Sequence, residues 1–193
     1  LLPAGLVFPV IASASLTAPI TIRTSAYASL NAQCYRVNPT IETAFMPTLL
    51  FRGENDNDRF RFVTGAHHYK VIGLHLKKDT SATFVPGAMT SMYTTTITLA
   101  SDYTQHIEYD RCWVQGGDGT TNYPATHALL TGISLDGNHN IVRGCYIQDI
   151  YAFQDSKAIN IGHGDGPYLI ENNYLASSGE NFLCGSSTYP VTG

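Results

Sequence analysis

Acidic and imidazole side chains in the C-terminal half of the sequence could cleave a glycosidic bond. Hydrolysis of such a bond needs two carboxyl groups about 5 to 9.5 Å apart. Asp136 together with Asp155 or Asp165 could supply them. His163 is a candidate general acid, because a carboxylate beside an imidazole favours its protonated form.

The same region could support β-elimination from a uronate, which needs a base and a cation that acidifies the α-proton. Lys157, if buried, or Arg61 could be the base. Ca²⁺ is a candidate cofactor, since Asp136, Asp155 and Asp165 could bind it through oxygen ligands. No other metal site is expected, because there is no Cys-x-x-Cys or His-x-x-x-His pair. The pair at 67–68 is two adjacent histidines without a third ligand.

Each candidate also has an ordinary structural explanation. Asp136-Gly137 and Asp165-Gly166 are common turn pairs. Asp155 could close a loop before a strand, and His163 lies between two glycines, where exposure is expected. The residues alone leave open whether the protein is an enzyme.

A sequence repeat must position these groups. Four segments align without gaps, each apolar at both ends with an aromatic-type residue before the last position: 71–76, 109–114, 142–147 and 170–175. A short alternating strand precedes each: 60–62, 97–99, 133–135 and 159–161, with 182–184 beginning a further repeat. The length variation is concentrated in one connection, as in solenoids whose insertions lie on one face.

The repeats predict stacked coils of parallel strands, about 4.8 Å apart. Five or six coils form one domain over residues 1–193, with less regular coils at 1–58, clear repeats at 59–185 and an open end at 186–193. The chain is expected to be a fragment with further coils beyond its C-terminus. One inward ladder is predicted to contain Leu76, Val114, Ile147 and Leu175. Another is predicted to contain Ile97, Ile133, Ile159 and Phe182.

The pattern at 133–137 and 140–147, and again at 167–175, resembles the repeat of the pectate-lyase-like superfamily. Segments 66–69, 109–112 and 179–181 also resemble uncharacterised bacterial β-helix proteins. The resemblance covers about residues 17–185 and implies an all-β, right-handed parallel β-helix. That superfamily includes lyases, hydrolases, esterases, epimerases, phage tailspikes and non-catalytic domains.

The resemblance also implies a substrate groove along the first strand of each coil. The outward positions there are Arg61, Thr98, Ser134 and Asn160. Asp136 and His163 would form one wall of the groove, with Asp155 and Lys157 on the other. The sequence lacks the paired-Asp signature of polygalacturonases and the Arg-x-Pro-x-x-Arg of pectate lyases.

Four aromatic-type side chains occupy one outward position of successive coils: His75, Trp113, Tyr146 and Tyr174. Such a stripe could stack sugar rings, with Trp113 as a substrate-binding residue. It could equally stiffen the sheet or lie under a loop, and this packing explanation is favoured because superfamily members usually bind ligands elsewhere.

The four cysteines are expected to be free and buried. Cys112 and Cys145 occupy equivalent inward positions, where parallel stacking holds Cβ atoms near 4.8 Å, longer than the usual ~3.8 Å of a disulfide. Cys184 aligns with inward Leu135 and Ile161.

Composition excludes several classes of protein. Hydrophobic residues make up 44% of the 193 residues, so the chain is not disordered. The net charge of −4 disfavours nucleic-acid binding. No apolar stretch approaches the roughly 20 residues of a membrane span, and the apolar residues 1–15, interrupted by Pro3 and Pro9, are expected to form a strand.

Three functions remain from these observations. The first is an extracellular carbohydrate-active protein, a polysaccharide lyase or glycoside hydrolase. The second is a non-catalytic module that binds a polysaccharide or other glycan, as in adhesion proteins or phage tailspikes; a structural spacer is a third alternative.

Overall fold

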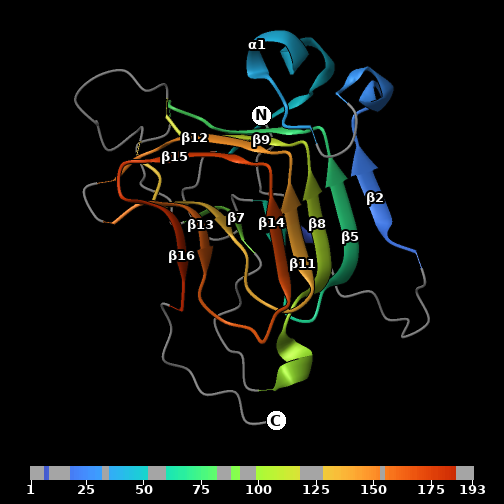
Figure 1. The fold of residues 1–193 in the computed structure, drawn as a ribbon, viewed down its shortest axis with the longest axis vertical. Coiled ribbons are helices and arrows are strands. Elements are labelled where there is room, and N and C mark those ends of the chain that lie inside the picture. The colour runs from blue at the N-terminus through green and yellow to red at the C-terminus, as the bar shows by residue number, and fades with distance from the viewer. Residues whose placement is uncertain are drawn as a thin grey trace.

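The computed structural model describes residues 7–8, 18–31, 35–51, 60–81, 88–91, 99–117, 128–152 and 155–185. In these ranges the chain is mostly β-strand, and the strands form three parallel sheets around an enclosed interior (Figure 1). No helix in this part of the chain is long and apolar enough to cross a membrane.

Each sheet contains every third strand of the chain. The first sheet is made of β1 (Val7–Phe8), β4 (Phe60–Phe62), β7 (Ala88–Ser91), β10 (Thr131–Ser134), β13 (Lys157–Ile161) and β16 (Glu180–Cys184). The second is made of β2 (Ile20–Arg23), β5 (His67–Ile72), β8 (Gln105–Asp110), β11 (Asn140–Arg143) and β14 (Tyr168–Glu171). The third is made of β3 (Thr48–Phe51), β6 (His75–Lys78), β9 (Trp113–Gln115), β12 (Tyr146–Ile150) and β15 (Tyr174–Ser177). We call one passage of the chain through the three sheets a circuit.

The predicted ladder in the third sheet is confirmed. Leu76 pairs with Val114, Val114 with Ile147, and Ile147 with Leu175. In the first sheet, Ile133 pairs with Ile159 and Ile159 with Phe182, also as predicted. The inward residues of the inner circuits are fully buried, so the alternation of apolar and polar residues sets the register.

The prediction for Ile97 in this ladder is wrong. Its place is taken by Thr90 of β7, which pairs with both Phe60 and Ile133. Leu99, expected at the end of a strand, is 54% exposed, while 97–98 lie outside the described residues. Segments 88–91 and 97–99 lie in the same long connection between repeats, and alternation alone does not decide which of them joins the sheet.

In the four circuits after the first, one residue with left-handed backbone turns the chain from the second sheet into the third. These residues are Gly73 (φ 65°), Arg111 (φ 49°), Gly144 (φ 59°) and Asn172 (φ 51°). Glycine adopts this conformation without strain, and asparagine more readily than most residues. At Gly144 a Cβ atom would also lie 2.8 Å from the carbonyl oxygen of Tyr35, so only glycine fits there. The turn-like position of the sequence repeat is therefore a corner of the fold.

The interior is filled by apolar side chains from all three sheets. Cys112 and Cys145 are buried, free thiols in this core, and the Cys112 N–H lies 3.4 Å from Cys145 Sγ. Cys184 is also free, but the prediction that it is buried is wrong, because no described strand covers it on the terminal strand β16. Cys34 lies outside the described residues. The prediction of free thiols is confirmed for the three cysteines that the structure describes.

Short helices lie outside the third sheet (Figure 1). They are η1 (Tyr27–Ser29), α1 (Pro39–Glu42) and η2 (Thr43–Phe45), with η3 (Ala100–Asp102) elsewhere in the chain. A second, small core of Leu30, Val37, Met46 and Ile72 forms beneath them. Residues 24–31 and 35–47, which we call the covering segment, cover part of the outer face of the third sheet.

Candidate functional site

The aromatic stripe on the outer face of the third sheet is confirmed. Trp113 pairs in register with His75 and with Tyr146, and Tyr146 pairs with Tyr174. The rings form two stacked pairs: His75 and Trp113 have centroids 3.7 Å apart, and Tyr146 and Tyr174 4.3 Å apart. Parallel in-register strands bring these residues together from four circuits.

The packing explanation of the stripe also holds in part. Trp113 and Tyr146 are half-buried and pack against the small core of Leu30, Val37, Met46 and Ile72. The covering segment, however, leaves hollows beside the rings.

Two hollows flank Tyr146. The first has a volume of about 400 Å³ and is lined by Asn38, Pro39, Thr40, Trp113, Gln115, Tyr146 and Gln148. The second, of about 420 Å³, is lined by Asn31, Tyr35, Arg36, Val37, Asn38, Tyr146 and Asn172. Aromatic faces beside amide groups suit a sugar, since the rings pack on its C–H faces and the amides hydrogen-bond its hydroxyls.

The indole N–H of Trp113 is a buried donor that meets no acceptor within the described residues. Buried polar groups are normally hydrogen-bonded, so such a donor calls for an acceptor from outside this set. Trp113 also lines the first hollow.

A buried carboxylate holds the covering segment in place. Glu42, only 2% exposed, accepts hydrogen bonds from the Asn31 N–H at 2.6 Å and the Asn38 N–H at 2.5 Å. The Val37 N–H donates to the Gly144 carbonyl at 2.8 Å. These hydrogen bonds anchor the backbone of Asn31, Val37 and Asn38, which line the hollows.

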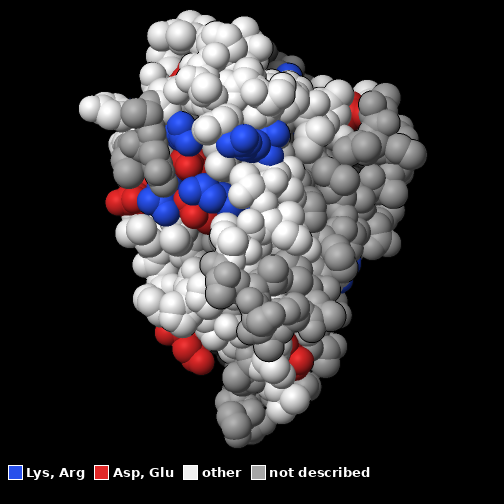
Figure 2. All heavy atoms as spheres, turned by 90° about the vertical axis from the view of Figure 1, so that its right-hand side faces the viewer, with Lys and Arg blue, Asp and Glu red and all other residues white. Residues whose placement is uncertain are grey.

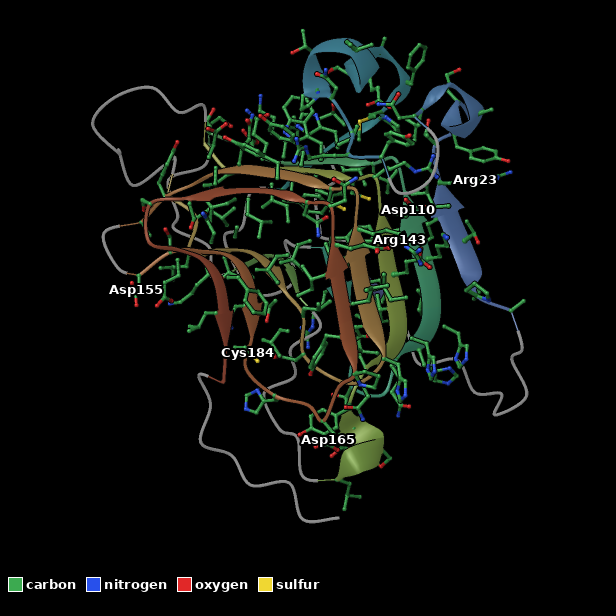
Figure 3. All side chains as sticks on the ribbon, viewed as in Figure 1. Arg23, Asp110, Arg143, Asp155, Asp165 and Cys184 are labelled. Atoms are coloured by element: carbon green, nitrogen blue, oxygen red, sulfur yellow. The ribbon has the colours of Figure 1, made fainter. Side chains whose placement is uncertain are left out.

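The second sheet carries a different feature, a network of paired charges on its outer face (Figures 2 and 3). Lys70 Nζ lies 2.9 Å from Glu108 Oε1 and 3.6 Å from Asp110 Oδ2. Arg143 contacts Glu108 at 2.9 Å and Glu171 at 3.7 Å. The charges compensate one another, so the network joins adjacent circuits rather than offering a strongly charged docking face.

Three histidines that the sequence analysis did not connect stack at the start of the second-sheet strands. The rings of His68 and His106 are 4.6 Å apart, and those of His106 and His139 4.9 Å apart. All three have left-handed backbone. Burial lowers the pKa of His68 and of His106, and neighbouring imidazoles add to the effect. In the sequence, these histidines are detectable because all three occupy the same position of the repeat that contains β5, β8 and β11.

The stacked histidines border a hollow of about 210 Å³. Their rings are nearly parallel, so their nitrogens do not converge on one point. Within the part of the chain that the structure describes, no three His, Cys, Asp or Glu side chains are arranged to hold a metal ion.

Asp136 and His163 lie on the same edge, as predicted, with Oδ1 and Nδ1 4.0 Å apart. Asp136 is 1% exposed and accepts hydrogen bonds from the backbone N–H groups of Gly162 at 2.6 Å and His163 at 2.9 Å. Its second oxygen accepts from the Ser134 hydroxyl at 3.3 Å. This carboxylate joins two circuits at a turn, and its oxygens are occupied.

Asp155 and Lys157 lie at the other end of β13. Lys157 Nζ is 3.8 Å from Asp155 Oδ2 and donates to the Asp155 carbonyl at 2.8 Å. β13 runs from Lys157 to Ile161, about 13 Å, so Asp155 is further from Asp136 than a glycosidase pair allows. Figure 3 also shows Asp155 and Asp165 far apart, which argues against a Ca²⁺ site shared by these carboxylates.

The predicted outward row of the first sheet contains Arg61, Ser134 and Asn160 in register, with Ser91 in the place expected for Thr98. Ser134 is 7% exposed, so only part of this row reaches solvent. A substrate groove along these residues stays a prediction.

Comparisons with protein-family models, curated proteins and solved structures give no match.

Proposed function

We propose that the chain is a right-handed parallel β-helix whose third sheet carries a glycan-binding site. The regular return of the chain through three parallel sheets supports the fold. Right-handed connection is the strong preference for parallel strands. Further coils and an extracellular location, where polysaccharides are abundant, are part of the same proposal.

One observation carries the proposed function: aromatic rings in register line hollows together with amide side chains. Trp113 and Tyr146 provide apolar ring faces, while Gln115, Gln148 and Asn38 provide hydrogen-bonding groups. Open, polar hollows of this kind suit a hydroxyl-rich ligand better than an apolar one.

Binding is favoured over cleavage. The four residues predicted to be catalytic form two separate pairs at opposite ends of β13. Asp136 is buried and already accepts three hydrogen bonds, which leaves it poorly placed to act on a substrate. Lyase or hydrolase activity is thus an outcome to be tested rather than part of the proposal.

A panel of soluble polysaccharides and oligosaccharides tests the function by titration calorimetry. Trp113→Phe keeps a ring but removes the indole N–H, and is expected to weaken binding about fivefold, the value of one ordinary hydrogen bond. Gln148→Ala should also weaken binding. Asn160→Ala, in the outward row of the first sheet, serves as the control and should leave affinity unchanged.

Two results would contradict the proposal. If no glycan in the panel binds, the function is wrong. If Asn160→Ala weakens binding while Trp113→Phe and Gln148→Ala do not, the glycan lies along the first sheet instead. Assays of reducing ends and of unsaturated-uronate absorbance should remain blank; product formation would establish an enzyme.

A further inference from the structure

The two hollows beside Tyr146 differ in charge. Every residue around the first is neutral. The second contains one charged side chain, the exposed Arg36, and no acidic residue. Because both hollows share Asn38 and Tyr146, they are adjacent and a single extended ligand could occupy both.

Arg36 differs from Arg111 and Arg143, which are paired with acidic side chains. Arg111 forms two hydrogen bonds with the Asp110 carboxylate, at 2.9 and 3.1 Å, and Arg143 is paired with Glu108 and Glu171. Arg36 forms no ion pair with any described residue, and its guanidinium lies 5.8 Å from the ring centroid of Tyr174. Guanidinium groups bind carboxylates and sulfates through paired hydrogen bonds, so this one is available to an anion.

The backbone that carries Arg36 is well anchored. Val37, its neighbour, is 1% exposed and is hydrogen-bonded to Gly144. On the other side of the covering segment, Arg111 donates to the Asn31 carbonyl at 2.5 Å and Glu42 binds the Asn31 and Asn38 amides. Because this backbone is already anchored, binding of a ligand would cost the ordering of the arginine side chain but not that of the backbone.

We propose that the ligand is an oligosaccharide with at least two units, one of which carries an anionic substituent bound by Arg36. The neutral unit packs in the first hollow, against Trp113 and Tyr146, and the anionic unit in the second. The substituent is a carboxylate or a sulfate ester. This inference rests on the proposed glycan-binding function, and it places the anion on the third sheet rather than in the groove along the first.

The test compares matched oligosaccharides by titration calorimetry with the whole chain. One set carries carboxylates, a second is the same set after reduction of the carboxylates to alcohols, and a third carries sulfate esters. The wild-type protein should bind a carboxylated or sulfated set at least tenfold more tightly than the reduced set, a difference of about 1.4 kcal/mol, because a charge-assisted hydrogen bond is stronger than a neutral one. The preferred set identifies the substituent.

Variants assign the preference to Arg36. Arg36→Gln should remove the tenfold difference without changing affinity for the reduced set, and Arg36→Lys should restore part of it. Arg23→Gln is the matched control, because Arg23 is also exposed and stacks on a tyrosine, Tyr27, at 3.8 Å. It should behave as wild type.

The binding results distinguish a failure of this inference from a failure of the proposed function. If reduced and anionic sets bind equally, or if Arg36→Gln retains the full preference, Arg36 does not select the ligand, although the site still binds glycans. If none of the sets binds, the proposed function and this inference are both wrong.

Discussion

At the residue scale, His75 shows how the stripe is tied to the sheet beneath it. Its Nδ1 lies 3.0 Å from Thr48 Oγ1 and its Nε2 lies 3.1 Å from Gln115 Oε1. Gln115 in turn donates to Asp149 at 3.0 Å, which orients its amide oxygen toward the imidazole. Nε2 therefore carries the proton, and Nδ1 accepts from the Thr48 hydroxyl.

Protonation of His75 is expected to destabilise the protein. Burial lowers its pKa from 6.5 to about 4. The unfolded chain therefore binds more protons than the folded protein between these values, and stability falls as the pH drops from about 6.5 to about 4. The loss approaches about 3 kcal/mol. Urea unfolding at pH 7 and pH 4.5 measures it.

His75→Gln is the control for this pH effect. It is expected to lower stability at pH 7 but to show a smaller loss on acidification than the wild type. The lowered pKa values of His68 and His106 act in the same direction and remain in the variant. An unchanged pH dependence in His75→Gln would show that other groups cause the acid sensitivity.

Thiol reactivity should separate the cysteines by burial. Cys184 is exposed and should react with a thiol reagent in the native protein. Cys112 and Cys145 are buried, and burial raises the pKa of the Cys145 thiol, so both should react only on unfolding. Unfolded protein without reductant should yield four thiols in all. Two or fewer would mean that a disulfide forms.

At the scale of elements, alternation predicts the regular circuits better than the connections. The ladder from Leu76 to Leu175 follows from repeats with the same number of residues in each segment. The sequence does not predict β7, because Ala88–Ser91 has weak apolar character. Segment 97–99 in the same connection alternates more clearly and is therefore the one expected to form the strand. Register there depends on chain geometry that a pattern of residue types does not encode.

The stripe of the candidate site follows from the repeat spacing, but its cover does not. Residues 24–31 and 35–47 have no counterpart in other repeats, and long-range contacts such as Val37 with Gly144 hold them. The hollows, and Arg36 beside the second of them, arise from this cover, so sequence patterns give no indication of them. The stacked histidines were detectable in principle, because they share one repeat position.

Core and outward positions of the sheets should differ in their contribution to stability. Ile147→Ala, at a fully buried ladder position, is expected to cost about 2 to 5 kcal/mol. Ser134→Ala removes a hydroxyl that donates to Asp136 and should cost about 1 kcal/mol. Denaturant unfolding measures both, and equal losses would contradict the assignment of inward and outward faces.

At the scale of the whole molecule, the last strands of the three sheets form one end of the stack of circuits. β14, β15 and β16 are the terminal strands of their sheets, and each exposes one large apolar side chain: Leu169, Tyr174 or Phe182. Unpaired strand edges with exposed apolar groups favour pairing with further strands. This end of the described structure is therefore suited to continue the stack.

Self-association through this end is the expected result when no further strands cover it. Sedimentation velocity over a range of concentrations should show oligomers of the 193-residue chain. Phe182→Lys should reduce association, because a charged lysine on the edge strand β16 opposes strand addition. Ile41→Lys is the matched control, since Ile41 is 68% exposed on α1, outside the three sheets. If the wild type stays monomeric, or if Ile41→Lys has the same effect as Phe182→Lys, the terminal strands do not mediate association.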